Sequence, residues 1–214
     1  MKLKRFIENY DGEQFDVIAV GGGITGSAVA YEAAHRGLKV ALVEKSDFAN
    51  ATSSATSKMI HGGFRYLAKA EFGLVRESLK ERRIMTNISP NFVHPFPFLF
   101  STYKKDKTPG WMIQLGMMLY EVLSFDKGWL WDKSKKMPRY RSLSAKEVFR
   151  QIPKANQKGL KGGYVYYDCI NHFPERHTLA FVKSAAKCGA SVSNYCELEE
   201  FIFSDPGPNK RTIR

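Results

Sequence analysis

Three glycines near the start of the chain, Gly21, Gly23 and Gly26, have the spacing G-x-G-x-x-G. In this spacing the first glycine permits a tight turn, the second lets a diphosphate approach the backbone, and the third lets a helix pack close to a strand. The spacing indicates a dinucleotide site only where it lies between a strand and a helix. The flanking residues therefore decide its meaning.

The flanking residues have that pattern. An apolar run over residues 15–20 predicts a buried strand, and an alanine-rich stretch over residues 24–36 predicts a helix that ends before Gly37. Residues 39–44 predict a second buried strand. A strand, a helix and a second strand within this length form a βαβ unit, in which the two strands are parallel.

The start of the predicted helix suits a phosphate group, because free N–H groups and the positive end of the helix dipole meet there. At the end of the second strand, Glu44 stands where a carboxylate accepts hydrogen bonds from an adenosine ribose. The residues expected to contact the dinucleotide here are Gly21, Gly23, Ile24, Thr25, Gly26, Glu44 and Lys45. NAD and FAD both bind to such a unit, so these residues leave the choice of cofactor open.

A second candidate site begins in the small polar segment at residues 46–57. Such a segment is expected to be a loop whose hydroxyl groups bind backbone or ligand. The pair Gly62–Gly63 would let the main chain pass close to a flat ring system, and His61, Arg65 and Tyr66 would bring polar and cationic groups toward it. The side chains expected to bind cofactor oxygens in this region are Thr52, Ser53, Ser54, Ser57 and Lys58.

Residues 52–67, TSSATSKMIHGGFRYL, resemble a signature segment of the FAD-dependent glycerol-3-phosphate dehydrogenases. Residues 20–37 are similar to the first signature of that family, and looser similarity continues through residues 71–75, 111–113 and 167–169. The resemblance covers most of this chain and corresponds to the N-terminal portion of the family. It implies FAD as the cofactor.

The resemblance further implies oxidation of sn-glycerol 3-phosphate to dihydroxyacetone phosphate, with electrons passed to a membrane quinone. It places His61, Arg65 and Tyr66 at active-site positions, and His61 also among the FAD contacts. Arg65 is the candidate for holding phosphate, because its planar guanidinium suits an oxyanion. His61 is the candidate for handling the hydroxyl proton, since an imidazole titrates near neutrality. Tyr66 is expected to pack against the flavin ring.

The implied fold class is α/β, with an FAD/NAD(P)-binding Rossmann-like domain and a parallel sheet, interrupted by part of a smaller α+β substrate domain. We expect the first part of the FAD-binding domain at residues 16–88, an inserted substrate or cap region at 89–173, and the continuation of the FAD-binding domain at 174–214. Helices are expected at residues 70–88, 111–125, 144–152 and 174–188. An edge strand or irregular extended segment is expected at 93–100, because of its two prolines. A strand is expected at 164–169, a strand-like segment at 191–203 and a turn at 205–208.

Residues 170–177, INHFPERH, depart from the family pattern, which often has an acidic pair followed by Arg-Leu, and this leaves the substrate more open than the cofactor. Family members are also longer. We therefore expect a truncated chain that binds FAD weakly and turns over poorly. The alternatives are another FAD-dependent oxidoreductase of the amino-acid/2-hydroxy-acid oxidase superfamily, and a catalytically silent fragment of an FAD domain.

The formal net charge of +12 includes two basic runs, at residues 104–107 and 133–141. No nucleic-acid-binding motif accompanies them, so nucleic acid is not an expected partner. A solvated surface, an anionic lipid surface or an anionic substrate accounts for such charge. Cys169, Cys188 and Cys196 lack metal-site spacing, so we expect no metal and free thiols in a reducing cytosol. We expect a cytoplasmic protein, peripheral on the inner face of the cell membrane, that forms a homodimer.

Overall fold

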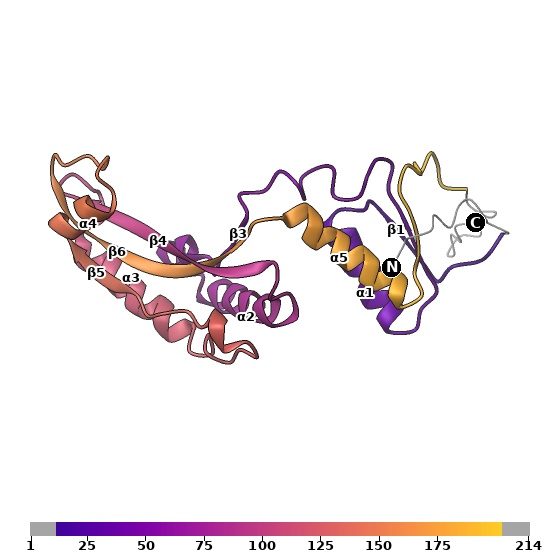
Figure 1. Cartoon of the computed structure of the whole chain (residues 1–214), viewed down its shortest axis with the longest axis horizontal. Helices are drawn as coiled ribbons and strands as arrows, with labels where there is room; N and C mark the ends of the chain where they lie inside the picture. Colours follow the sequence, from indigo (N-terminus) through magenta and orange to yellow (C-terminus); the bar gives the residue numbers. More distant parts are fainter. Residues whose placement is uncertain (1–11, 203–214) are drawn as a thin grey trace. The chain divides into compact units, whose positions relative to one another are not determined.

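The computed structural model describes residues 12–202. The chain divides into two compact units: unit 1 comprises Met1–Thr56 with Pro174–Arg214, and unit 2 comprises Ser57–Phe173. Each unit is built from its own sheet and helices (Figure 1). The expected domains, which begin at residues 16, 89 and 174, remain predictions, since compactness alone assigns no function to a unit.

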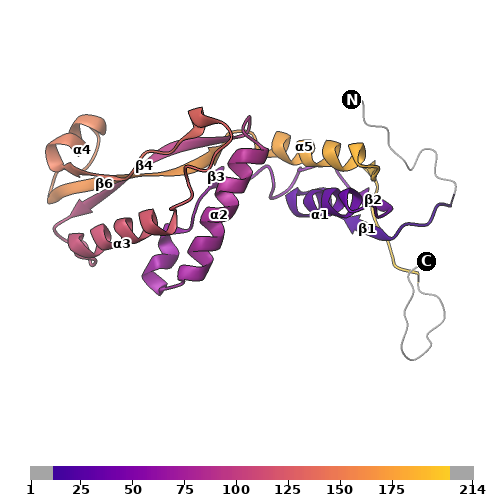
Figure 2. The ribbon, with the colours of Figure 1, turned by 90° about the horizontal axis from the view of Figure 1, so that it is seen from below.

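Unit 1 contains the predicted βαβ unit. Strands β1 (Val17–Val20) and β2 (Val40–Val43) are parallel neighbours joined by helix α1 (Ile24–His35). Strand β7 (Ser191–Ser193) pairs in parallel with β2, which gives the order β1-β2-β7. Helix α5 (Pro174–Lys187) precedes β7 and lies beside α1 in both ribbon views (Figures 1 and 2).

The two helices cover one face of this sheet. Ala19, Leu42 and Val192, one from each strand, are buried in a core that the helices share. The opposite face of β1 is open within residues 12–202, where Ile18 and Val20 are 54% and 52% exposed. Parallel strands are normally buried on both faces. This face of β1 is thus available for further packing, whereas Ala41, which pairs with Ile18 on the same face, is buried.

Unit 2 is an antiparallel α+β structure centred on strand β6 (Leu160–Asn171). Strand β4 (Val93–Tyr103) pairs along one edge of β6, while β3 (Met59–Ile60) and β5 (Arg141–Ser144) pair along the other. Helices α2 (Phe72–Ile88) and α3 (Gly110–Leu123) lie on the same side of the sheet (Figures 1 and 2), and α4 (Ala145–Gln151) packs against the first half of β6. The 3-10 helices η2 (Phe64–Lys69) and η3 (Lys133–Lys135) complete the unit.

Most expected elements are present. Strand β4 lies at the sheet edge as predicted, and it tolerates Pro95 and Pro97 because an edge strand needs N–H donors on one side only. Helix α4 begins with a capping box in which Ser144 accepts from the N–H of Glu147 and the Glu147 carboxylate accepts in return. The α1, α2, α3, α5 and β6 elements are likewise confirmed.

The strand expected at residues 191–203 is wrong beyond Ser193. Tyr195 has a φ of 50° and donates its N–H to the Ser46 carbonyl at 2.9 Å, and Cys196 donates to the Glu44 carbonyl at 2.9 Å. The backbone therefore turns onto the loop that follows β2. Residue 203 and the turn expected at 205–208 lie outside the described residues.

Four elements, β3, η2, η3 and β5, were not expected. Strand β5 buries only Leu143, and a single apolar residue shows no periodicity. The cysteines match expectation, since Cys169 is buried, Cys188 is exposed and all three thiols are free. Over residues 12–202, no helix is long and apolar enough to cross a membrane.

Candidate functional site

The turn between β1 and α1 has the geometry that the glycine motif predicts. Gly21 has a φ of +103°, in the region that favours glycine. A Cβ atom on Gly26 would lie 2.0 Å from the carbonyl oxygen of Gly21, so α1 packs this close to the turn only without a side chain there. Helix α1, described over its whole length, has no acidic residue in its first turn. A hollow of about 390 Å³ at this turn is lined by residues that include Gly21, Gly23, Ile24, Thr25, Gly26 and Ser53.

The loop after β2 reaches this hollow through Ser53. The N–H of Ile24 donates to the Ser53 hydroxyl oxygen at 2.9 Å, which places Ser53 at the start of α1. The Ser54 hydroxyl instead donates to the Ala51 carbonyl at 2.9 Å, within its own loop. Thr52 is exposed in the same loop. The structure thus brings Ser53 to the glycine turn and leaves Thr52 and Ser54 on the loop surface.

Glu44 connects the glycine turn to the same loop. Its carboxylate accepts from the N–H of Gly22 at 2.6 Å, and from the N–H and hydroxyl of Ser46 at 2.8 and 2.9 Å. Burial raises the pKa of Glu44, but hydrogen bonds from Ser46 and Gly22 outweigh it and hold the pKa below its usual value. The exposed neighbour Lys45 lowers the pKa further. The carboxylate therefore stabilises the turn, while its expected contact with a ribose stays a prediction.

Unit 2 contains a larger hollow, of about 930 Å³. All three expected catalytic residues, His61, Arg65 and Tyr66, line it, and so does Ser57. The remaining walls include side chains of α3, β4 and β6. Lys58, with a φ of 61°, is exposed in the same unit. The expected cofactor contacts are therefore distributed over both units.

One wall of this hollow is aromatic. Tyr166 of β6 stacks on Phe64 at a centroid distance of 5.4 Å and on Phe98 of β4 at 5.7 Å. Phe64 also meets Tyr120 of α3 edge to face at 5.5 Å. Burial raises the pKa of Tyr166 to about 12, so its phenol is neutral at physiological pH. The wall is therefore apolar and uncharged.

The Gly62–Gly63 turn is held from two directions. The N–H of Gly62 donates to Asp168 Oδ1 at 3.0 Å, and the N–H of Gly63 donates to His61 Nδ1 at 3.1 Å. A Cβ on Gly62 would lie 2.2 Å from Leu79 Cδ2 and 2.3 Å from the Tyr120 hydroxyl. Close packing against α2 and α3 thus requires glycine at Gly62, a reason that the sequence did not show.

Asp168 is the centre of a buried polar cluster. Its side chain pairs with that of Arg82, and the two are 1% and 2% exposed. The Tyr120 hydroxyl donates to the same oxygen, Oδ1, at 2.8 Å. Burial lowers the pKa of Arg82, but the charge of Asp168 and its hydrogen bond to Arg82 raise it, and the net shift is upward, so the guanidinium stays charged. Burial and the charge of Asp168 raise the pKa of Tyr120 well above its usual value, so it remains a neutral donor.

Sequence reasoning missed this cluster as part of the site. One signal was available on α2, where Val75, Leu79, Arg82 and Thr86 are all buried. This spacing continues one helical face, and a charged residue on a buried face requires a partner. That partner, Asp168, lies 86 residues away in the chain. The identity of the partner follows from tertiary structure alone.

The FAD dependent oxidoreductase family model matches residues 16–211, which is most of the chain. The chain belongs to the FAD dependent oxidoreductase family. Within that family it is 43% identical over 181 residues to a glycerol-3-phosphate dehydrogenase of Synechocystis sp., covering 85% of this chain and 31% of the relative. It is 35% identical over 202 residues to an aerobic glycerol-3-phosphate dehydrogenase of Staphylococcus aureus, covering 94% of this chain and 35% of the relative.

A solved structure of an FAD-bound protein is similar to this chain in fold. Glycerol-3-phosphate dehydrogenase from Bacillus halodurans, complexed with FAD, superposes with a TM-score of 0.65 at 27% identity, covering 92% of this chain and 30% of that chain. The chain thus spans about a third of the length of these relatives. The family confirms the expected fold class and FAD as the family's cofactor. The turn in unit 1 fits that cofactor, since small residues and a helix start without acidic side chains suit a diphosphate.

Proposed function

We propose that this protein takes part in FAD-dependent oxidation of sn-glycerol 3-phosphate to dihydroxyacetone phosphate. The main structural support for this proposal is that Arg65 and His61, from one short segment, line the same hollow in unit 2. Relatives at 35–43% identity that are named glycerol-3-phosphate dehydrogenase support the substrate. The cofactor, when bound, supplies the acceptor for a hydride and its two electrons.

In this proposal Arg65 holds the phosphate of the substrate. Its side chain is exposed at the hollow, and a guanidinium offers paired N–H donors whose geometry matches phosphate oxygens. In unit 1, the N-terminal end of α1 and Ser53 hold the diphosphate of the cofactor. Tyr66 packs partly buried against the core formed by Val75 and Leu79, and so supports the segment that carries Arg65.

His61 holds the substrate's hydroxyl oxygen. Because Nδ1 accepts from the N–H of Gly63, the neutral ring carries its proton on Nε2, which is then a donor. Taking the hydroxyl proton at Nε2 requires the other tautomer, in which Nδ1 carries the proton and the contact with Gly63 is lost. His61 therefore orients the hydroxyl in one tautomer and acts as a base in the other.

The test is dye reduction by the FAD-loaded protein with sn-glycerol 3-phosphate, glycerol, 2-hydroxy acids and amino acids. We expect a rate that depends on the phosphate, and we expect Arg65→Ala to raise KM more than about tenfold, as loss of a charged hydrogen bond does. The matched control Arg150→Ala removes an exposed arginine of α4 and leaves the rate unchanged. Faster turnover of an amino acid or a 2-hydroxy acid would favour the alternative superfamily activity.

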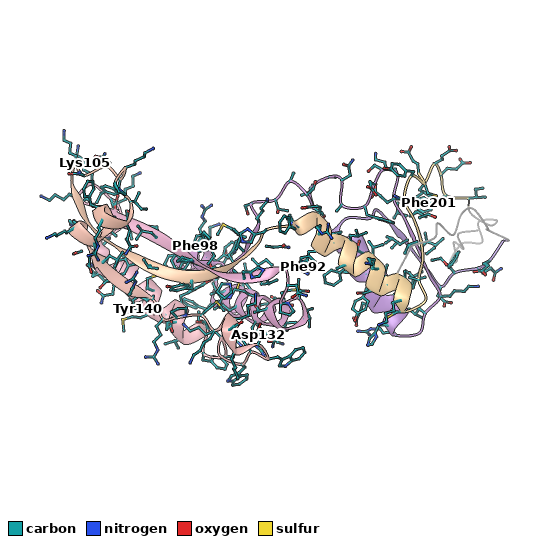
Figure 3. The ribbon with its side chains drawn as sticks, viewed as in Figure 1. Phe92, Phe98, Lys105, Asp132, Tyr140 and Phe201 are labelled. Carbon is teal, nitrogen blue, oxygen red and sulfur yellow. The ribbon has the colours of Figure 1, made fainter. Side chains whose placement is uncertain are left out.

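We propose further that the electrons pass to a quinone and that unit 2 docks on an anionic membrane surface. On α3, Trp111, Leu115 and Val122 share one helical face and are 65%, 56% and 67% exposed. Exposed Trp131 lies near the second basic run, and Lys105 of the first run points outward beyond β4 (Figure 3). Tryptophan and lysine are typical of membrane-interface contacts.

Vesicle flotation tests the docking. We expect binding to anionic vesicles that weakens with salt, and little binding to zwitterionic vesicles. The substitution Trp131→Ser should weaken flotation, whereas Phe173→Ser, which also removes an exposed aromatic side chain, should not. Equal binding to both kinds of vesicle at all salt concentrations would contradict the proposal. The homodimer and the cytoplasmic location remain predictions.

A further inference from the structure

A buried ion pair contacts the segment that carries the proposed site. The side chains of Arg82 and Asp168 are 2% and 1% exposed. Removing two charges from water costs free energy that their attraction often fails to recover, so a buried pair is weak evidence of a stabilising role. Its contacts show another role. Asp168 belongs to β6 and also lies at the wall of the 930 Å³ hollow.

Two consecutive hydrogen bonds connect this pair to His61. Asp168 Oδ1 accepts from the N–H of Gly62 at 3.0 Å, and the next N–H in the chain, that of Gly63, donates to His61 Nδ1 at 3.1 Å. Arg82 donates to the same Asp168 oxygen, and also to the Tyr167 carbonyl at 3.3 Å, which holds the carboxylate against β6. The direction of the Gly63 N–H therefore depends on where Asp168 holds Gly62.

We propose that Asp168, fixed by Arg82, is a positioning residue that sets the Gly62–Gly63 turn and thereby the ring orientation and tautomer of His61. The effect of Asp168 on the conformation of the turn does not depend on which reaction the protein catalyses. The effect of Asp168 on turnover rests on the proposed function, because the tautomer decides whether Nε2 of His61 donates to the substrate oxygen or accepts its proton.

The conformation of the Gly62–Gly63 turn lets Asp168 affect the other residues of the hollow as well as His61. Gly63 has a φ of +74° and is the residue before η2, so the rotation of this peptide also sets how η2 begins. Helix η2 carries Arg65 and Tyr66, which line the hollow with His61. Hydrogen bonds to an ionised acceptor are about twice as strong as neutral ones, so a carboxylate holds the turn more firmly than an amide.

The test compares two double variants of the full chain, Arg82→Met with Asp168→Asn and Arg82→Met with Asp168→Leu. Both remove the two charges together, so neither leaves a buried charge unpaired. Asparagine and leucine have similar shapes, but only asparagine retains an acceptor for the N–H of Gly62. Asp126→Asn is the control for loss of a buried carboxylate, since Asp126 pairs with Arg76 and Arg83 instead of Arg82.

The measurements are amide hydrogen exchange at Gly62 and the ¹⁵N shifts of the His61 ring, in selectively labelled protein without substrate. We expect wild type and the Asp126 variant to protect Gly62 and to keep the Nε2–H tautomer of His61. The asparagine variant, whose acceptor is neutral and lacks Arg82, should protect Gly62 less than wild type. We expect the leucine variant to exchange Gly62 at least about tenfold faster, as loss of a hydrogen bond predicts, and to show mixed tautomers.

Equal Gly62 exchange and equal ring shifts in the asparagine and leucine variants would overturn the proposal. Turnover of sn-glycerol 3-phosphate is then compared in the same variants. A lower kcat with unchanged KM in the leucine variant extends the positioning role to catalysis. Failure of wild type to bind sn-glycerol 3-phosphate, with the exchange difference intact, would refute the proposed function and leave the positioning role standing.

Discussion

Substituting Gly26 by alanine perturbs the glycine turn at its closest approach. The new Cβ would lie 2.0 Å from the carbonyl oxygen of Gly21, whereas nonbonded heavy atoms in good contact lie about 3.5–4.0 Å apart, a shortfall of roughly 1.5 Å. A backbone carbonyl cannot rotate away as a flexible side chain can. Helix α1 must therefore move off the turn, and with it the hollow that the turn lines.

The expected magnitude follows from two opposing effects. Alanine in a helix gains up to about 1 kcal/mol over glycine, while overpacking costs about 1–3 kcal/mol, and here it falls on backbone. A matched control is Gly73→Ala in α2, where the new Cβ meets nothing within 4 Å and only the gain applies. We expect the two variants to differ by about 2 kcal/mol or more in free energy of unfolding.

Urea unfolding followed by far-UV circular dichroism measures this difference. All three tryptophans lie in unit 2, so fluorescence alone would not report on α1. FAD titration provides the second measurement, in which Gly26→Ala should weaken binding and Gly73→Ala should not. A Gly26→Ala protein as stable as wild type, with unchanged FAD affinity, would refute the assigned close contact between α1 and the turn.

Three further outcomes are expected. The pKa of Glu44 is lowered from 4.5 in the folded state, so its contribution to stability is full above pH 4.5 and is lost as pH falls through the folded pKa. The difference in free energy of unfolding between wild type and Glu44→Gln should therefore shrink in acid, and a constant difference would contradict this. Cys188 should react with a thiol reagent in the native protein, whereas Cys169, whose pKa burial raises, should react only after unfolding, as counted by mass spectrometry with Cys169→Ser as the control. Because Ile18 and Val20 are exposed, the 214-residue chain should bind FAD weakly, and a stoichiometric yellow protein would contradict that.

The parts of the fold that the sequence predicts are those specified by neighbouring residues. The β1-α1-β2 unit follows from apolar runs and alanines close together in the chain, and Gly37, with a φ of +85°, follows α1 as predicted. The end of β7 was not predictable, because the left-handed Tyr195 is held by the Ser46 carbonyl, 149 residues earlier. The apolar residues after Ser193 therefore predict a continued strand, because the sequence does not show the contact that turns the backbone.

The candidate site shows the same division. The grouping of His61, Arg65 and Tyr66 around one hollow follows from their closeness in sequence. The contacts that fix them do not, since Arg82 and Asp168 meet only after α2 has packed against β6. Charge on a buried helical face predicts that some partner exists. The charge on the helix does not indicate which strand provides the partner.

Strand β6 supplies both the aromatic wall and the acceptor that fixes the turn, from Tyr166 and Asp168. Side chains of a strand alternate between its faces, so these two positions share a face only while their separation is two residues. Inserting or deleting one residue between them would send one of the two side chains to the opposite face. A change in length between these two positions would therefore separate the aromatic wall from the acceptor that fixes the turn, whereas a change at either end of β6 would leave both side chains on one face.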